Sequence, residues 1–196
     1  VVDSGASLTS TVLVELHHHV GDTMVAAFRE QGGKPSIGID VELYTTGQMF
    51  REMQAALLFA RGKEVRNNAM RGNSPLKTIP VRSREALEWT TLNGAKALGI
   101  GDVTGSLTVG KRADLILIRG NDINVPPIAN IETTVVQAAT PANVDTVMVD
   151  GRIVKRGGRL VGYDVEKIVR DARASALRIR TAAGGRLAPG NGSASR

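Results

Sequence analysis

No cysteine occurs among the 196 residues, and this absence removes two classes of structure. Without thiols the chain forms neither disulfides nor thiolate metal sites. A chain without disulfides suits a reducing compartment, so we expect a cytoplasmic location. The hydrophobic fraction of 42% is sufficient for a packed core in a globular protein of this length.

Aromatic residues are scarce, at 3%, although the formal net charge is +6. Few aromatic side chains leave few platforms on which nucleic-acid bases stack. The basic residues are spread over 63–84 and 152–180 with acidic residues between them, which is typical of a solvated surface. We therefore expect no nucleic-acid partner.

Long apolar runs and a targeting segment are also missing. No apolar run has the length needed to span a bilayer, and residues 1–5 show neither an initiator methionine nor a signal-peptide pattern. We expect no membrane partner and a chain that starts within a longer sequence.

The first forty residues alternate between strand and helix patterns. Residues 6–14 favour a strand, and residues 22–31 predict a helix with Asp22 as its N-cap and Gly32-Gly33 at its end. A short apolar run over 34–40 predicts a second strand. Such a βαβ unit is nearly always parallel, so we expect a parallel sheet of more than two strands.

Two candidate site residues follow these strands. The second strand carries Asp40 to its C-terminal end, where side chains in parallel α/β folds converge on a ligand. An aspartate there binds metal or moves a proton, whereas the local sequence alone favours an Asx-turn or N-cap. His17, His18 and His19 follow the first strand, and at most two of them share a site because consecutive side chains diverge. For His18 the residues leave a pocket position and a loop position open.

Helices are predicted in the middle of the chain. Apolar residues from Met49 to Ala60 trace one helical face that should cover the sheet, and residues 62–80 indicate a long exposed connection. Ser83 is a suitable cap for a further helix through Leu98, which Gly99 ends.

From Gly105 onward the pattern changes to β. An apolar strand is predicted at the end of 105–118, and segments 144–149 and 152–156 alternate on either side of Asp150-Gly151. That dipeptide predicts a two-residue type I′ hairpin, because both turn positions need positive φ. Asp150 is therefore interpreted as a turn residue.

A last helix is predicted after the hairpin. Asp164 is its expected cap, and an apolar face should be buried through Val165, Ile168, Val169, Ala172 and Leu177. The tail over 185–196 is rich in Gly, Ser and Ala and is predicted to be disordered.

The β segments carry a resemblance to a known family. Residues 105–118 follow the pattern G-x-L-x-x-G-K-x-A-D-L and residues 147–154 the pattern V-x-V-x-G-x-x-V, and both resemble motifs of the amidohydrolase superfamily, in particular its cytosine-deaminase-like and chlorohydrolase-like members. The helical residues 90–99 also resemble that family. The resemblance implies an α/β fold, namely the C-terminal part of a (β/α)₈ TIM barrel with a small flanking β-sandwich and an incomplete barrel.

The resemblance also implies a division of the chain. Residues 1–100 would be the last strands and helices of the barrel, and residues 101–163 would belong to the β-sandwich. Residues 164–184 would form a C-terminal helix before the tail, 185–196.

By the same resemblance Asp40 falls on the family's metal-binding, proton-shuttling aspartate, which helps to hold Zn²⁺ or Fe²⁺ and accepts a proton from the water that attacks. His18 resembles a histidine that faces the substrate in one branch of the family. The remaining histidine ligands would precede Val1, so we expect the isolated chain to be inactive. The implied reaction is hydrolysis of a C–N or C–Cl bond in a small heterocyclic molecule, and a homo-oligomer is a further expectation. The alternative is a non-catalytic fragment whose open sheet edge another chain completes.

Overall fold

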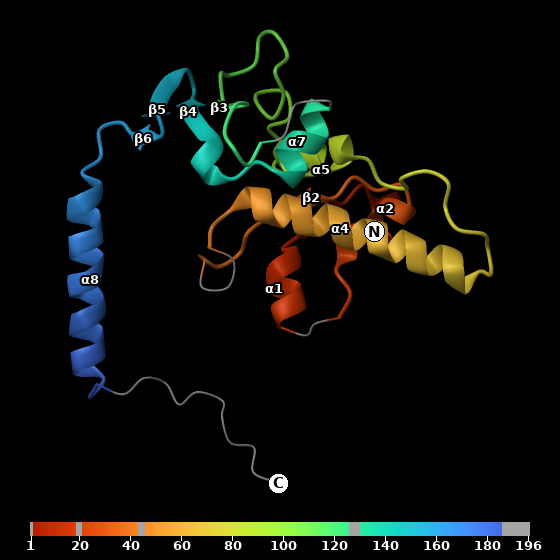
Figure 1. Ribbon diagram of the computed structural model, residues 1–196, viewed down its shortest axis with the longest axis horizontal. Helices are drawn as coiled ribbons and strands as arrows, with labels where there is room; N and C mark the ends of the chain where they lie inside the picture. Colours follow the sequence, from red (N-terminus) through yellow and green to blue (C-terminus); the bar gives the residue numbers. More distant parts are fainter. Residues whose placement is uncertain (1, 19–20, 43–45, 126–129, 186–196) are drawn as a thin grey trace. The chain divides into compact units, whose positions relative to one another are not determined.

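The structure is a computed structural model that describes residues 2–18, 21–42, 46–125 and 130–185. The chain divides into two compact units, Val1–Arg159 and Leu160–Arg196. None of the helices in the described ranges combines the length and the apolar character that a membrane span requires. The elements in Figure 1 are η1 (Val2–Ser4), β1 (Thr9–Ser10), α1 (Val12–His17), α2 (Met24–Glu30), β2 (Ser36–Ile37), α4 (Met49–Met70), α5 (Ser83–Trp89), α6 (Leu92–Ala97), β3 (Leu115–Ile118), α7 (Ile131–Gln137), η2 (Pro141–Asn143), β4 (Val144–Val149), β5 (Arg152–Arg156), β6 (Arg159–Leu160) and α8 (Val165–Ala182).

A pair of short parallel strands organises the first part of the chain. In β1 and β2, Thr9 lies opposite Ser36 and Ser10 opposite Ile37, which confirms the predicted parallel pairing. Among the described residues this sheet has two strands, fewer than the sequence pattern predicted. It is therefore open and not closed into a barrel.

The first strand is shorter than predicted because α1 begins at Val12. Glu15 explains the early start of this helix. Its carboxylate accepts hydrogen bonds from the Thr11 N–H at 2.8 Å and from the Ser10 hydroxyl at 2.9 and 3.0 Å. These bonds satisfy donors at the helix N-terminus that would otherwise need another partner. The cap of α2 also differs from the prediction, since Thr23 and not Asp22 precedes Met24.

Helices pack against the parallel strands and enclose the core. In Figure 1, α4 runs between α1 on one side and α5 and α7 on the other. One cluster of buried side chains joins these elements and comprises Val12, Val25, Ala26, Ile37, Met53, Ala56, Leu57, Ala60, Val81, Ala86, Trp89 and Val136. The apolar face predicted for α4 thus packs in the core as expected.

Two helices in the middle differ in extent from the prediction. Helix α4 continues to Met70, so residues 62–70 of the expected exposed connection are helical, because strong helix formers outweigh the single Gly62. The helix predicted from Ser83 to Leu98 is broken into α5 and α6. The hydroxyl of Thr90 donates to Ala86 O at 3.2 Å and that of Thr91 donates to Leu87 O at 2.6 Å. Such bonds to the preceding turn compete with helix continuation.

The antiparallel sheet has the order β3-β4-β5-β6. At the β4–β5 hairpin, Asp150 has φ 49° and Gly151 has φ 76°, as the predicted type I′ turn requires. Residues 105–114 precede the strand and are not part of it. Helix α7, which our sequence analysis did not predict, is capped by Asn130, whose side chain accepts a hydrogen bond from Thr133 N at 2.8 Å.

Helix α8 belongs to the second compact unit. Its predicted cap is confirmed, since Asp164 Oδ1 accepts a hydrogen bond from Lys167 N at 2.8 Å. Within this second unit the predicted apolar face is not covered, since Val165, Ile168, Val169 and Leu177 are 41 to 64% exposed and helix α8 buries none of its residues. Nearly all of the predicted disordered tail lies outside the described residues, which end at Gly185.

Candidate functional site

The carboxyl ends of β1 and β2 lie at the same edge of the parallel sheet, because the two strands run in one direction in register. The Gly38 N–H donates to Ser10 O at 2.9 Å, which extends the pairing beyond β2. From this edge β1 leads into α1, and β2 leads to Asp40. In parallel α/β folds this is the edge where ligands bind.

Asp40 follows β2 by three residues and is exposed. Its φ of 63° lies in the left-handed region, which aspartate tolerates better than most residues with a side chain. The strand predicted over 34–40 is shorter than expected, since it ends at Ile37. Asp40 therefore sits on a sharp turn of the backbone at the carboxyl edge.

Small side chains line the strands on the approach to Asp40. The hydroxyls of Thr9 and Ser36 are 2.7 Å apart and share a hydrogen bond. A Cβ atom added at Gly38 would lie 3.3 Å from Thr11 Cγ2 and 3.4 Å from Thr9 Cγ2, so glycine keeps the two strands in close contact. This face offers hydroxyl groups and little apolar bulk beside the strand ends.

His18 is exposed and is the C-cap of α1, where its N–H donates to Val14 O. The sequence predicted the histidines directly after a strand, but His17 is the last residue of α1 and the six residues of this helix separate His18 from β1. At 1.5 Å per residue this helix is about 9 Å long. His18 and Asp40 thus lie on segments that leave the same sheet edge, with His18 at the far end of a short helix. His19 lies outside the described residues.

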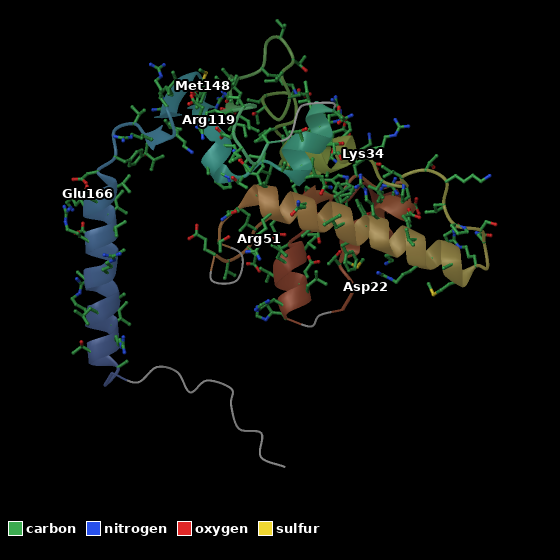
Figure 2. All side chains as sticks on the ribbon, in the orientation of Figure 1. Asp22, Lys34, Arg51, Arg119, Met148 and Glu166 are labelled. Carbon is green, nitrogen blue, oxygen red and sulfur yellow. The ribbon has the colours of Figure 1, made fainter. Side chains whose placement is uncertain are left out.

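A buried carboxylate that the sequence patterns did not predict forms a hydrogen bond with the first of these segments, α1. Glu52 in the first part of α4 is 0% exposed, and its Oε2 accepts a hydrogen bond from Leu13 N at 3.2 Å. Burial raises the pKa of Glu52, as does the nearby Glu15, whereas the Leu13 N–H and Arg51 act in the opposite direction. Figure 2 labels Arg51 at the N-terminal end of α4.

The signal for Glu52 was present in the sequence. Glu52 stands three residues after Met49 and four before Ala56, so helical spacing places it on the same face as the apolar residues. A charged residue at such a position is informative because glutamate is rarely buried without a role.

The described residues do not form a complete metal site. Over the ranges that the structure describes, no group of three or more histidine, aspartate or glutamate side chains could hold a metal ion. Zinc sites need three or four protein ligands. Asp40 fits such a site as a single oxygen ligand only.

Asp114, the aspartate of the G-x-L-x-x-G-K-x-A-D-L motif, has a structural role. Asp114 Oδ1 accepts a hydrogen bond from Asp150 N at 2.6 Å, and its Oδ2 accepts one from Thr104 Oγ1 at 2.7 Å. These two bonds hold the pKa of Asp114 below its usual value. Asp114 therefore ties the loop before β3 to the turn of the β4–β5 hairpin.

Sequence comparison places these elements in a known context. The sequence profile described as "Amidohydrolase family" matches residues 12–154. A 5-methylthioadenosine/S-adenosylhomocysteine deaminase from Desulforudis audaxviator is 44% identical over 93 residues, which are 47% of this chain and 22% of that protein. A 5′-deoxyadenosine deaminase from Methanococcus maripaludis is 37% identical over 120 residues, which are 61% of this chain and 25% of that protein. The chain thus spans about a quarter of the length of these relatives.

Solved structures match the fold over most of the chain. A zinc-bound adenosine deaminase from Xanthomonas campestris has a TM-score of 0.78 at 26% identity and matches 92% of this chain and 39% of that one. A zinc complex of atrazine chlorohydrolase from Arthrobacter aurescens has a TM-score of 0.72 at 21% identity, over 88% of this chain and 36% of that one. These matches confirm the predicted fold class, which is part of a TIM-barrel hydrolase fold with open sheets.

Proposed function

Because this chain belongs to the amidohydrolase family, we propose that the protein containing it is a metal-dependent hydrolase in which Asp40 takes part in the chemistry. The supporting observation is the position of Asp40 after β2, at the sheet edge where β1 also ends. In this family of folds the carboxyl ends of the barrel strands carry the reacting groups.

Asp40 has two roles in this proposal. Its carboxylate is one ligand of a divalent cation, Zn²⁺ or Fe²⁺, and it accepts a proton from the water that attacks the substrate. When bound, such a cation lowers the pKa of water toward neutrality. The other ligands come from histidines outside this chain, because the described residues supply no complete set.

His18 is proposed as a substrate-binding residue. This proposal is supported by its exposure and by its place at the end of α1, on a segment that leaves the same sheet edge as Asp40. A neutral imidazole both donates and accepts a hydrogen bond, which suits the hydroxyl or ring nitrogen of a small polar molecule.

The proposed substrate is a small nitrogen heterocycle with an amino group, hydrolysed at the C–N bond. The relatives are named as deaminases of adenosine-like nucleosides, which favours this reaction over cleavage of a C–Cl bond. We also propose the division into barrel residues 1–100, β-sandwich residues 101–163 and helix 164–184. A cytoplasmic location and a homo-oligomeric state stay predictions.

The coding sequence upstream of Val1 provides the test. A reading frame that continues upstream and encodes a His-x-His pair after a strand supports the proposal. The encoded protein should then release ammonia from 5′-deoxyadenosine or 5-methylthioadenosine, and elemental analysis should find a divalent metal. An upstream sequence without such histidines would overturn the proposal. It would favour the alternative, a non-catalytic fragment whose sheet edges another chain completes.

A further inference from the structure

Glu52 is a charged residue in a fully buried place. Its side chain is 0% exposed, and one carboxyl oxygen, Oε1, has no hydrogen-bond partner among the described residues. A buried carboxyl with an unsatisfied oxygen lowers stability. An apolar side chain would fill this position in α4 without that cost, so the acceptor itself has a use.

The hydrogen bond that Glu52 accepts from Leu13 joins two segments of the proposed site. Leu13, whose N–H it accepts at 3.2 Å, is the second residue of α1, the helix that follows β1 and ends at His17. Glu52 is the fourth residue of α4, the helix that follows β2 and Asp40. Apolar contacts such as those of Val12 hold the two helices together, but they have no preferred direction. The Glu52–Leu13 bond is directional and fixes the register of α1 against α4.

We propose that Glu52 is a positioning residue that fixes the helix leading to His18 against the helix following Asp40. Its effect on turnover rests on the proposed function, whereas the hydrogen bond and its effect on α1 do not. Glu52 itself does not touch substrate in this proposal.

The surroundings of Glu52 indicate that α1 is positioned by the hydrogen-bond acceptor of this side chain and not by its negative charge. Glu15, whose charge raises the pKa of Glu52, already accepts hydrogen bonds from Ser10 and Thr11 and disfavours a second negative charge beside it. Burial acts in the same direction, and exposed Arg51 opposes it only in part. A neutral side chain of the same shape with an acceptor oxygen should therefore replace Glu52.

Four variants of the 196-residue chain separate these features. Glu52→Gln keeps an acceptor oxygen without the charge. Glu52→Leu keeps the volume without an acceptor, and Glu52→Ala removes both. Leu57→Ala is the matched control. It removes a fully buried side chain from the same helix, and a leucine side chain has no group that could form a hydrogen bond with α1.

Amide hydrogen exchange followed by NMR is the first measurement. In Glu52→Leu and Glu52→Ala, the amides of α1 from Leu13 onward should exchange at least about tenfold faster relative to the core amides of α4, the expected effect of losing one buried hydrogen bond. Glu52→Gln should match the wild type. Leu57→Ala should change both helices together. If Glu52→Ala does not fold, the exchange rates of the α1 amides in Glu52→Leu test the proposal.

Turnover of the complete hydrolase is the second measurement. Glu52→Leu should lower kcat by about tenfold, a typical effect of small misplacement, and Glu52→Gln should restore it, with Leu57→Ala near the wild type at low temperature. Unchanged α1 exchange in Glu52→Leu, or a Gln variant that behaves like the Leu variant, would overturn the inference. A complete protein without hydrolase activity would overturn the proposed function instead. The hydrogen-exchange measurement would still test whether Glu52 positions α1.

Discussion

Arg29 on α2 and Glu85 on α5 form a two-point ion pair. Arg29 Nε donates to Glu85 Oε2 at 2.6 Å, and Arg29 Nη2 donates to Glu85 Oε1 at 3.2 Å. The same guanidinium donates to Glu64 Oε1 on α4 at 3.0 Å and to Pro80 O at 3.2 Å. Only 23% of the Arg29 side chain is exposed, so one residue connects three helices in a partly buried place.

Replacement of Arg29 should therefore lower stability. Arg29→Ala removes four hydrogen bonds and leaves Glu85 half-buried without its cation, so we expect a loss of about 1 to 3 kcal/mol in the free energy of unfolding. Arg29→Lys should recover only part of this lost free energy, because an ammonium group cannot make the forked contact of a guanidinium. Urea unfolding, followed by the fluorescence of the single tryptophan, Trp89, measures both.

Arg84 provides the matched control for Arg29. It pairs with Glu88 and Glu132, but 64% of its side chain is exposed, and exposed pairs contribute little. Arg84→Ala should leave the urea midpoint nearly unchanged. Equal effects of Arg29→Ala and Arg84→Ala would contradict the importance of the buried pair.

Because of the Arg29–Glu85 pair, we expect the protein to be less stable in acid. Burial alone would raise the pKa of Glu85, but hydrogen bonds from Arg29 and from the Arg82 N–H outweigh it and lower that pKa below its ordinary value of 4.5. The stability from the pair is therefore full above about pH 4.5 and is lost as the pH falls through the lower, folded-state pKa. In Arg29→Ala this acid-dependent part of the unfolding free energy should shrink.

Gly105 should tolerate substitution less than Gly110, although both have positive φ, 85° and 94°. A Cβ at Gly105 would lie 2.7 Å from Ala95 Cβ and 3.0 Å from Leu92 Cα, whereas nothing lies within 4 Å at Gly110. Gly110→Ala should cost about 1 kcal/mol of strain, and Gly105→Ala should cost about 1 to 3 kcal/mol more, because the loop must move off α6. Thermal unfolding of both variants measures the difference, and equal losses would show that the loop moves freely.

Patterns that depend on neighbouring residues in sequence were predictable. The Asp150-Gly151 turn and the Asp164 cap each rest on backbone preferences of one or two residues, and both have the expected form. The parallel pairing of β1 and β2 followed from the order of strand and helix.

Features that depend on side-chain competition were not predictable with the same rules. The start of α1 depends on Glu15 reaching back to Ser10 and Thr11, and a strand pattern does not include that interaction. The break between α5 and α6 depends on two threonine hydroxyls that bond to the preceding turn. For the site, Asp40 could be selected from its place after a strand, but the six helical residues before His18 could not.

Asp40→Asn should abolish most activity of the complete hydrolase while the fold survives. The amide keeps the size of the carboxyl group but accepts no proton at useful pH, and general-base catalysis is typically worth about 10² to 10⁴ in rate. Asparagine also tolerates the left-handed backbone at this position. Turnover is measured at equal metal occupancy, with circular dichroism as the check on folding.

Asp22→Asn is the control for Asp40, since Asp22 is also an exposed aspartate. It should turn over substrate like the wild type. Near-normal turnover of Asp40→Asn with metal bound would make Asp40 a turn residue and remove its proposed role.

The last prediction concerns the pH dependence that Glu52 imposes on stability. Burial raises the pKa of Glu52 above its ordinary value of 4.5, so the folded state binds this proton more tightly than the unfolded state. The contribution of Glu52 is therefore most favourable below about pH 4.5 and is lost as the pH rises through the folded-state pKa. The pKa of Glu85 is shifted in the opposite direction. The pH dependence of the unfolding free energy of the wild type therefore does not isolate the contribution of Glu52.

The difference between wild type and Glu52→Gln isolates it, because glutamine does not titrate and all other groups are shared. As the pH rises from 4 to 8, the wild type should lose stability relative to the Gln variant, with a slope of at most about 1.4 kcal/mol per pH unit for one proton. Urea unfolding at each pH, followed by Trp89 fluorescence, gives this difference. A difference that is flat across the range would mean that Glu52 has an ordinary pKa. Because its carboxyl is fully buried, that result would require the α1–α4 contact to open to water in solution.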